Sequence, residues 1–522
     1  MMKLLSIGFG AFILTVSPAL AQRIPRYMYA EAGVSAASTN QTPFWMHANQ
    51  FGIVPKEGPF GTVRAGIYRD YRPYADSAAG KSSRGIRFDW GYGLNVVANA
   101  APQSAVLLPE LYVKARISIF EVRAGRWRQV IGLADSTLGV GPYSWSANAL
   151  PMPRVEVSIP VFTPIEFTKG ILSVQGAYAH GWFDNGGIIK NFYLHQKALY
   201  FRLGKETWPV RLYGGANHQV QWGGRSSINN PLFVKDGRLP STFRDYIDVV
   251  TGASLPARSV VDTTRLPTID SNNRIGNHLG SVDLGGELLL PGFSLLLYRQ
   301  FIFEDGSLFH GNNITDGLTG IRFQSRKPLS DAFQLRHIVF EVMDTRNQGG
   351  PEFTFEDKTR GNDEYFNNYQ YAMGWSYLGR TIGTPFITPQ TDSREGLPKM
   401  NITPDDLRSF TNNNRVLVVH AGVAGNIFRN YTFQLKCSVS DNRGRYIIPF
   451  PYHTWQVSSY ARFGMPLNAA QGLWANLTVA NDNGLLYKNS TGFYFSIRKE
   501  WLSGPVGRFA RSARSVTNPR HY

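Results

Sequence analysis

The stretch Phe493-Tyr494-Phe495-Ser496-Ile497-Arg498 alternates apolar side chains with side chains that carry a polar group. Successive side chains of a β-strand point to opposite faces, so Phe493, Phe495 and Ile497 share one face. A barrel that crosses a membrane needs this period of two, because lipid lies outside and water or polar side chains lie inside. The stretch therefore predicts one strand of a transmembrane β-barrel.

The same alternation recurs along the chain. In residues 111–117, Tyr112, Lys114 and Arg116 share a face opposite four apolar residues. Burying two cations in a dry core would cost roughly several kcal/mol each, and a hydrated lumen removes that cost. A soluble sandwich of two sheets alternates with the same period and is the alternative fold. Further alternating stretches are 121–127, 417–423, 431–439, 455–463 and 473–479.

The N-terminus resembles a secretory signal. Lys3 precedes an apolar stretch over 4–16, and Ala19-Leu20-Ala21 gives a small-x-small cleavage pattern, so we expect cleavage after Ala21. A retained helical anchor is the alternative, but it would need about 20 apolar residues. We therefore expect a signal peptide over 1–21, a barrel over 22–501, a basic extension over 502–522, and export to the outer membrane.

Composition supports a sheet protein with many turns. The 522 residues include 52 Gly, 25 Tyr, 33 Phe and 11 Trp, and 17% are charged, which suits glycine-rich turns and aromatic girdles. The formal net charge is +17. The basic residues are scattered and the chain is exported, so we expect lipopolysaccharide or acidic glycan as the counter-charge and no nucleic acid.

Three long polar stretches predict loops: 223–276, 343–368 and 384–414, with one short helix expected over 242–250. Loops of this length are usually functional or disordered. In outer-membrane barrels long loops face outward and short turns face the periplasm.

Catalytic and metal motifs are missing from the sequence. It has no GxSxG elbow, no HExxH helix, no Walker loop and no CxxC pair. Cys437, the only cysteine, falls on the apolar face of 431–439, which indicates a small lipid-facing or buried residue and not a nucleophile. We expect no enzyme activity, no cofactor and no metal.

A series of blocks, in one order across nearly the whole mature chain, resembles the capsule-assembly Wzi family of outer-membrane proteins. It looks like the longer branch of that family, found in Bacteroidetes-type anaerobes of gut and mouth. The first block is Thr42-Pro43-Phe44-Trp45-Met46-His47-Ala48-Asn49-Gln50-Phe51-Gly52, and the others are 123–126, 132–133, 146–153, 180–182, 195–200, 215–224, 276–280, 303–306, 316–318 and 374–375.

The resemblance implies an all-β fold, a closed transmembrane antiparallel barrel of about 18 strands. It implies a lectin-like role in holding or organising capsular polysaccharide or exopolysaccharide at the cell surface. We expect a monomeric barrel in contact with outer-membrane lipid. The better-studied branch plugs its periplasmic mouth with an N-terminal helical bundle, whereas residues 27–34 of this chain predict a strand, so an equivalent bundle is not expected.

Sugar recognition uses flat aromatic faces, amides and, for acidic sugars, Arg forks. The same residue types also form turns beside Gly, lumen ion pairs and aromatic girdles. A porin or channel, and an outer-membrane hydrolase, are alternative functions. The candidate carbohydrate-binding residues are Arg126, Asn148, Asn217, His218, Trp222, Asn277, His278, Asp283, Asn414 and Arg415.

Overall fold

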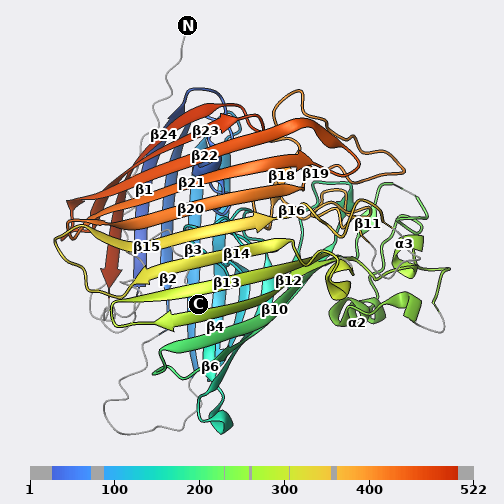
Figure 1. Ribbon diagram of the computed structural model, residues 1–522, viewed down its shortest axis with the longest axis horizontal. Helices are drawn as coiled ribbons and strands as arrows, with labels where there is room; N and C mark the ends of the chain where they lie inside the picture. The colour runs from blue at the N-terminus through green and yellow to red at the C-terminus, as the bar shows by residue number, and fades with distance from the viewer. Residues whose placement is uncertain are drawn as a thin grey trace.

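A computed structural model shows one closed antiparallel barrel of 18 strands, in which β1 pairs with β24 to complete the cylinder (Figure 1). It describes residues 26–71, 88–228, 230–257, 261–304, 306–353 and 361–503. The barrel strands are β1 (Arg26–Ala37), β2 (Phe60–Arg69), β3 (Phe88–Ala100), β4 (Ala105–Ile117), β5 (Phe120–Arg126), β6 (Arg154–Pro164), β7 (Leu172–Trp182), β9 (Tyr193–Leu203), β10 (Val210–Trp222), β12 (Asn277–Leu289), β13 (Phe293–Glu304), β14 (Gly317–Ser325), β15 (Gln334–Asp344), β20 (Val416–Ile427), β21 (Tyr431–Gly444), β22 (Pro449–Asn468), β23 (Leu473–Gly484) and β24 (Ser490–Ser503).

Small elements decorate the connections between these strands. Among the described residues, no helix is long and apolar enough to cross a membrane. The helices are α1 (Phe44–His47), α2 (Phe243–Thr251) and α3 (Thr268–Ser271), with the 3-10 turns η3 (Glu166–Thr168), η4 (Leu255–Ala257) and η5 (Ser307–His310). The short strands are β8 (Ile189–Lys190), β11 (Arg225–Ser226), β16 (Ser376–Tyr377), β17 (Arg380–Thr381), β18 (Thr388–Pro389) and β19 (Thr411–Asn413).

The two ends of the barrel differ in the length of their connections. Because neighbouring strands are antiparallel, connections alternate between the ends. One end carries short turns such as 118–119, 290–292 and 428–430, together with the start of β1 and the end of β24. The other end carries the long connections 38–59, 127–153, 223–276 and 345–415. The connections 223–276 and 345–415 gather at the right in Figure 1.

The alternation predicted for the strands is confirmed. In β24, Phe493, Phe495 and Ile497 are 51%, 42% and 44% exposed on the outside, while Ser496 and Arg498 are buried facing the lumen. Cys437 is exposed on the outer face of β21. A belt of exposed apolar side chains around a closed barrel is what lipid covers. A sandwich is excluded, because the sheet closes on itself instead of packing on a second sheet.

The lumen is filled by the connections 38–59 and 127–153, which we call the plug, and by part of 345–415. Nearly every residue from Trp127 to Met152 is buried. Wall side chains on many strands bond the plug. These bonds are Asn99 to Ile53 O (3.0 Å), Asp283 to Leu133 N (2.7 Å), Gln300 to Tyr143 N (3.2 Å), Glu341 to Val140 N (2.6 Å), His420 to Leu138 O (2.7 Å), Ser438 to Trp45 Nε1 (2.9 Å) and Asp482 to Phe44 N (2.7 Å).

The connection 345–415 is hydrogen-bonded to the plug at the loop end of the barrel. Ser146 N donates to Ile382 O at 2.9 Å, Thr384 N donates to Tyr143 O at 3.1 Å, and Trp375 Nε1 donates to Ser144 O at 2.6 Å. The backbones approach so closely at Gly383 that a Cβ there would lie 1.8 Å from the Tyr143 carbonyl oxygen. The two segments therefore form one body inside the barrel.

The strand, the helix and the loops predicted from sequence are mostly confirmed. Residues 27–34 lie in β1, and the helix expected over 242–250 is α2, capped by Thr242. The loop over 223–276 matches the connection between β10 and β12. The stretches 343–368 and 384–414 belong to one connection, 345–415, while Met343 and Asp344 complete β15. The signal peptide expected over 1–21 lies outside the described residues, and so does most of the basic extension expected over 502–522.

Candidate functional site

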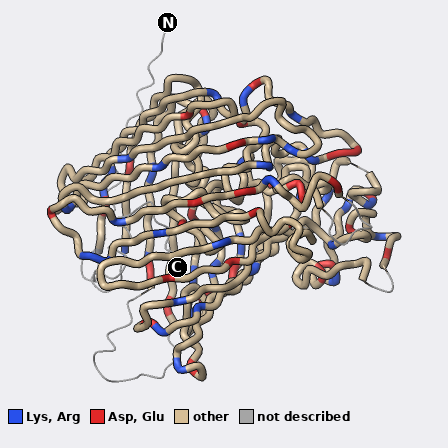
Figure 2. The backbone as a smooth tube through the Cα atoms, in the orientation of Figure 1, with Lys and Arg blue, Asp and Glu red and all other residues tan. Residues whose placement is uncertain are grey.

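A partly open pocket lies at the loop end, between the connections 223–276 and 345–415, and its empty space of about 640 Å³ includes open solvent. We call it the loop pocket. Figure 2, which colours the backbone by residue type, shows acidic and basic residues in the loops at this end. The pocket is lined by Ile269, Asn273, Arg274, Gly276, Asn277, Glu304, Phe353, Asn362, Asp363, Glu364, Asn367, Asn368, Tyr369, Gln370 and Arg408.

Aromatic and amide contacts join the two connections beside the pocket. The Tyr369 ring stacks on Phe233 with centroids 5.4 Å apart, and the Arg408 guanidinium lies 3.9 Å from the Tyr369 centroid. Gln370 Nε2 donates to Phe233 O at 3.0 Å and to Asp270 Oδ2 at 2.7 Å. These contacts fix the position of 223–276 against 345–415, so the pocket is formed before any ligand arrives.

The pocket's acids are engaged by donors. Glu304 Oε1 accepts from Tyr143 OH at 2.6 Å, and Asp363 Oδ1 accepts from Ser307 Oγ at 2.6 Å. Glu364 pairs with Arg445 at 2.7 Å, and both side chains are buried. Carboxylates held in this way act mainly as structural acceptors.

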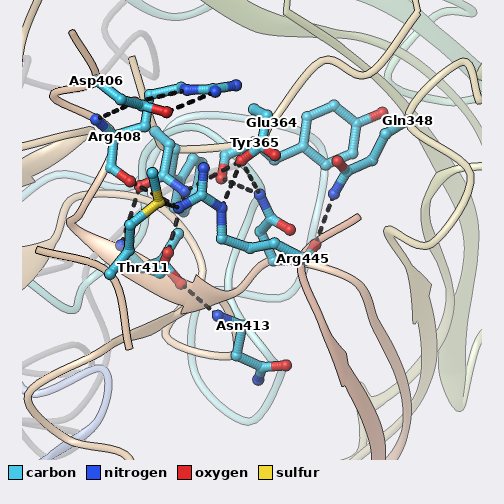
Figure 3. A network of polar contacts seen from close by, with 12 residues as sticks. Gln348, Glu364, Tyr365, Asp406, Arg408, Thr411, Asn413 and Arg445 are labelled. Atoms are coloured by element: carbon cyan, nitrogen blue, oxygen red, sulfur yellow. Dashed lines mark hydrogen bonds and ion pairs between the residues drawn. The ribbon is translucent and has the colours of Figure 1, made fainter. Parts of the chain in front are cut away.

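Arg445 links Glu364 to Arg408, another residue that lines the pocket (Figure 3). Its Nη1 donates to Arg408 O at 2.6 Å, and Arg408 forms a two-point contact with Asp406, at 3.0 Å through Nε and 2.8 Å through Nη2. The guanidinium of Arg408 is therefore held in a fixed orientation beside the pocket, with its Nε and Nη2 atoms engaged by Asp406.

The backbone of the pocket wall is strained. Asn362, Glu364 and Phe366 have φ values of 46°, 48° and 67°, in the left-handed region. Asn tolerates this conformation, whereas Glu and Phe adopt it at a cost of about 1–3 kcal/mol each. The side-chain oxygen Oδ1 of Asn362 is buried and has no hydrogen-bond partner among the described residues. Backbone strain of this kind clusters at functional sites, and the Asn362 oxygen is an acceptor for a hydroxyl donor.

Asp270 links α3 to the pocket wall. Its Oδ1 accepts from Gly276 N at 3.2 Å, while its Oδ2 accepts from Gln370. Burial raises the pKa of Asp270 to about 7, and the hydrogen bonds from Gln370 and Gly276 oppose that shift. The charge of this carboxyl therefore changes near neutral pH.

This arrangement suits a hydroxyl-rich ligand. Amides both donate and accept hydrogen bonds, as sugar hydroxyls do, and Arg forks pair with the carboxylates of acidic sugars. Among the described residues, no group of three or more His, Cys, Asp or Glu side chains is placed to hold a metal ion.

Two of the candidate residues predicted from sequence face the lumen and hold the plug. Asn217 bonds Ser144 Oγ at 2.6 Å, Ser281 Oγ at 2.7 Å and Tyr200 OH at 3.0 Å. Asp283 accepts from Leu133 N at 2.7 Å as well as from Tyr200 OH at 2.8 Å. Both are fully buried between the wall and the plug.

Three others point to the opposite side of the wall. His218, Trp222 and His278 lie on the outer face of β10 and β12, because neighbours in a strand alternate sides. His218 Nε2 lies 2.9 Å from His278 Nδ1, and Trp222 packs against Tyr246 of α2 at 5.0 Å between centroids. The structure thus separates Asn217 from His218 although they adjoin in sequence.

The remaining five candidates are spread over the loop end. Asn277 lines the loop pocket, and Asn414 supports its wall, with Nδ2 donating to Tyr365 O at 3.3 Å. Elsewhere, Asn148 Nδ2 donates to Thr381 Oγ1 at 2.8 Å, Arg126 donates to Tyr377 OH at 3.0 Å, and Arg415 lies 3.7 Å above the Tyr446 ring. A role of these ten residues in carbohydrate binding stays a prediction.

Sequence reasoning missed most of the pocket. Arg274 and Arg408 carry no local signature. The run Asn367-Asn368-Tyr369-Gln370 does carry one, since three amides beside an aromatic residue in a long loop resemble a sugar-binding surface. Only the folding of two distant connections onto each other shows that these residues line one pocket.

No protein-family model matches this chain, and no curated protein matches it either. One similar solved structure is Wzi of Escherichia coli, described as a carbohydrate-binding β-barrel and outer-membrane protein involved in group 1 capsule assembly. It has a TM-score of 0.54 at 13% identity, covering 90% of this chain and 83% of that one.

OccK2 of Pseudomonas aeruginosa (TM-score 0.43, 8% identity, 92% of this chain and 98% of that one) and OccAB4 of Acinetobacter baumannii (0.44, 8%, 93% and 100%) are also similar. At these TM-scores the two similarities carry no further argument. Membership of the longer branch of the Wzi family stays a prediction. The similarity to Wzi shows that the chain shares the barrel fold of that E. coli carbohydrate-binding protein.

Proposed function

We propose that this protein is a barrel of the outer membrane that binds capsular polysaccharide or exopolysaccharide at the cell surface and helps to organise it there. The observation that carries the proposal is the loop pocket, which lies at the end of the barrel with the long connections and whose fifteen lining residues include six amides, two arginines and three carboxylates. The barrel fold shared with a carbohydrate-binding barrel supports it. The signal peptide expected over 1–21 would bring the chain to this membrane.

The filled lumen favours binding over transport. Wall residues on strands around the barrel hold the plug, and the connection 345–415 closes it from the loop end. A substrate porin needs a water-filled path, and its lumen residues would be hydrated instead of bonded to a buried segment. A ligand therefore meets this protein at the loops.

The binding experiment uses the purified full chain on an array of bacterial capsular polysaccharides and exopolysaccharides. The test variant is Asn362→Gly, which removes the unused buried acceptor while glycine keeps the left-handed backbone. Asn191→Gly is the matched control, because Asn191 is also an asparagine with a left-handed φ (55°) but lies exposed in the connection 183–192. We expect about tenfold weaker binding of the best polysaccharide, equivalent to one lost hydrogen bond of about 1.4 kcal/mol, in the first variant alone.

Arg274→Gln tests whether the ligand is acidic. If the variant binds more weakly than the wild type at low salt, and this difference shrinks at high salt, the sugar is charged, because exposed charge pairs weaken as ionic strength rises. Arg225→Gln, an exposed arginine in the same connection, is the control. An array with no binding to the wild-type chain would contradict the proposal.

The cellular experiment is deletion of the gene. If the protein retains polysaccharide, the deletion should release it from the cell surface into the medium. Complementation with the wild-type gene should restore attachment, and complementation with the Asn362→Gly variant should restore it less. Unchanged attachment in the deletion strain would count against the proposed role.

A further inference from the structure

The connection 223–276 folds back over the outside of the barrel. Val249 of α2 is fully buried in a cluster with Val220 and Trp222, which point outward from β10. Lys197 Nζ on β9 donates to Val250 O, and Tyr246 OH lies 2.8 Å from Tyr178 OH on β7. Figure 1 shows α2 beside the loop ends of β10 and β12. The helix therefore lies against the outer wall near the rim.

Beneath α2, the outer wall carries polar residues in place of the usual apolar ones. His180 pairs opposite His195, and Val220 lies opposite both His195 and His278, so these positions cross four neighbouring strands in one row. His218 stacks on His278 with ring centroids 5.0 Å apart. We call His180, His195, His218 and His278 the outer histidine row.

The row lies on the same side of the wall as the exposed apolar belt. His195 and Leu199 lie four residues apart on β9, so their side chains point to the same side of the wall, and Leu199 is 49% exposed. His278 has the same relation to Val282, which is 40% exposed. Imidazoles and a lysine facing hydrocarbon are strongly unfavourable. Yet His195 is fully buried and His278 is 8% exposed, because α2 and the residues around it cover them.

The outward face of α2 is apolar. Phe243 and Ile247, one turn apart on the helix, are 79% and 48% exposed. The helix is well defined, with a capping box between Thr242 and Asp245 and a left-handed Gly252 at its C-terminus. Beside it, Tyr178 and Trp182 on the outer face of β7 are each 42% exposed. Phe243 and Ile247 thus continue the exposed apolar surface of the wall.

We propose that α2 lies in the outer leaflet of the membrane, with Phe243 and Ile247 in contact with acyl chains. The helix replaces a polar stretch of the wall, the outer histidine row and Lys197, with an apolar one. If water covered this side, the imidazoles would need no cover and two large apolar side chains would gain nothing by facing outward. The exposed Arg244 beside Phe243 is suited to the lipid phosphates at the interface. The inference rests on the membrane location proposed above.

Spin labelling tests the membrane location of the barrel and the placement of α2 separately. The full chain is reconstituted in phosphatidylcholine vesicles with a nitroxide on a single cysteine, and collisions with oxygen are compared with collisions with a water-soluble nickel chelate. Cys437, the only cysteine, is the reference for the belt. In a Cys437→Ser background, Phe243→Cys and Ile247→Cys report on α2, and Phe309→Cys, on a residue 92% exposed in η5, is the aqueous control.

We expect labels at 437, 243 and 247 to collide more with oxygen than with the chelate, and the label at 309 to show the reverse. Chelate accessibility at 243 and 247 equal to that at 309, with position 437 still shielded, would overturn the placement of α2 and leave the membrane barrel intact. Chelate accessibility at 437 as well would overturn the membrane location, and the placement of α2 with it.

Discussion

The Nε atom of Arg445 lies 2.7 Å from Oε2 of Glu364, and both side chains are almost completely buried beside the loop pocket. Taking one partner away leaves a charge without its counter-ion in a site with little water, which destabilises a folded region by about 3–5 kcal/mol. The pair joins the turn 445–448, which follows β21, to the connection 345–415. Neither residue lies in a barrel strand, so loss of the pair should act on the loops and not on the barrel.

Arg445→Met should therefore open the loops while the barrel stays intact. We expect limited proteolysis to cut within 345–415 much faster than in the wild type, while the resistance of the barrel to unfolding in detergent on an unheated gel is unchanged. The double variant Arg445→Met/Glu364→Gln should recover part of the protection, because it removes the unpaired charge. A double variant as labile as the single one would contradict this account.

Glu341→Ala should loosen the plug. The Glu341 carboxylate accepts from Val140 N and from Tyr298 OH, each at 2.6 Å. Its removal leaves two buried donors unpaired, at about 1–3 kcal/mol each. In planar bilayers we expect a silent wild type and brief conductance steps in the variant. Glu206→Ala, at a carboxylate whose side chain is 75% exposed, is the matched control. Steady conductance of the wild type would show that the lumen is open.

The protection of the loop pocket should fall as pH rises. The pKa of Asp270 is about 7 in the folded chain and about 3.9 when unfolded. Between these two pH values Asp270 is protonated in the folded chain and ionised in the unfolded chain. The free energy of unfolding therefore falls as pH rises from about 3.9 to about 7, and it does not change further above pH 7. Hydrogen exchange of 223–276, corrected for its intrinsic pH dependence, measures the effect.

Asp270→Asn should remove most of that pH dependence, because the amide cannot ionise and Gln370 can turn over to bond it. Asp236→Asn, on an exposed residue of the same connection, should keep it. Equal pH dependence in both variants would assign the effect to another group.

Phe495→Arg should destabilise the reconstituted barrel. Phe495 is 42% exposed on the outer face of β24, and an arginine facing lipid costs about 2–4 kcal/mol near the bilayer midplane. Phe309→Arg, in the loop turn η5, should change the free energy of unfolding by less than about 0.5 kcal/mol. Urea unfolding in vesicles makes the comparison, and equal, small effects would argue against a lipid-facing β24.

Much of the barrel could be predicted from local sequence. The alternation in 493–498 and 111–117 assigns each side chain to lipid or lumen, because the period of two is a property of the strand alone. The helix after Thr242 was predictable for a similar reason, since its cap lies within one turn of it.

The site could not be predicted in the same way. The block 215–224 suggests one group of polar residues, yet Asn217 holds the plug inside the barrel and His218 lies under α2 outside it. The pocket unites Arg274 with Arg408, which are brought together only when 223–276 packs on 345–415. Even the buried segment 127–153 has no period, because its partners are wall residues on many strands.

The sequence by itself determined the strands and their two faces, since alternation acts between neighbouring residues. Closure of the sheet depends on pairing between β1 and β24, at opposite ends of the chain. Only the tertiary structure decided that the lumen is filled, that two loops form a polar pocket and that a helix covers the outer wall, because each of these depends on contacts between residues far apart in the chain.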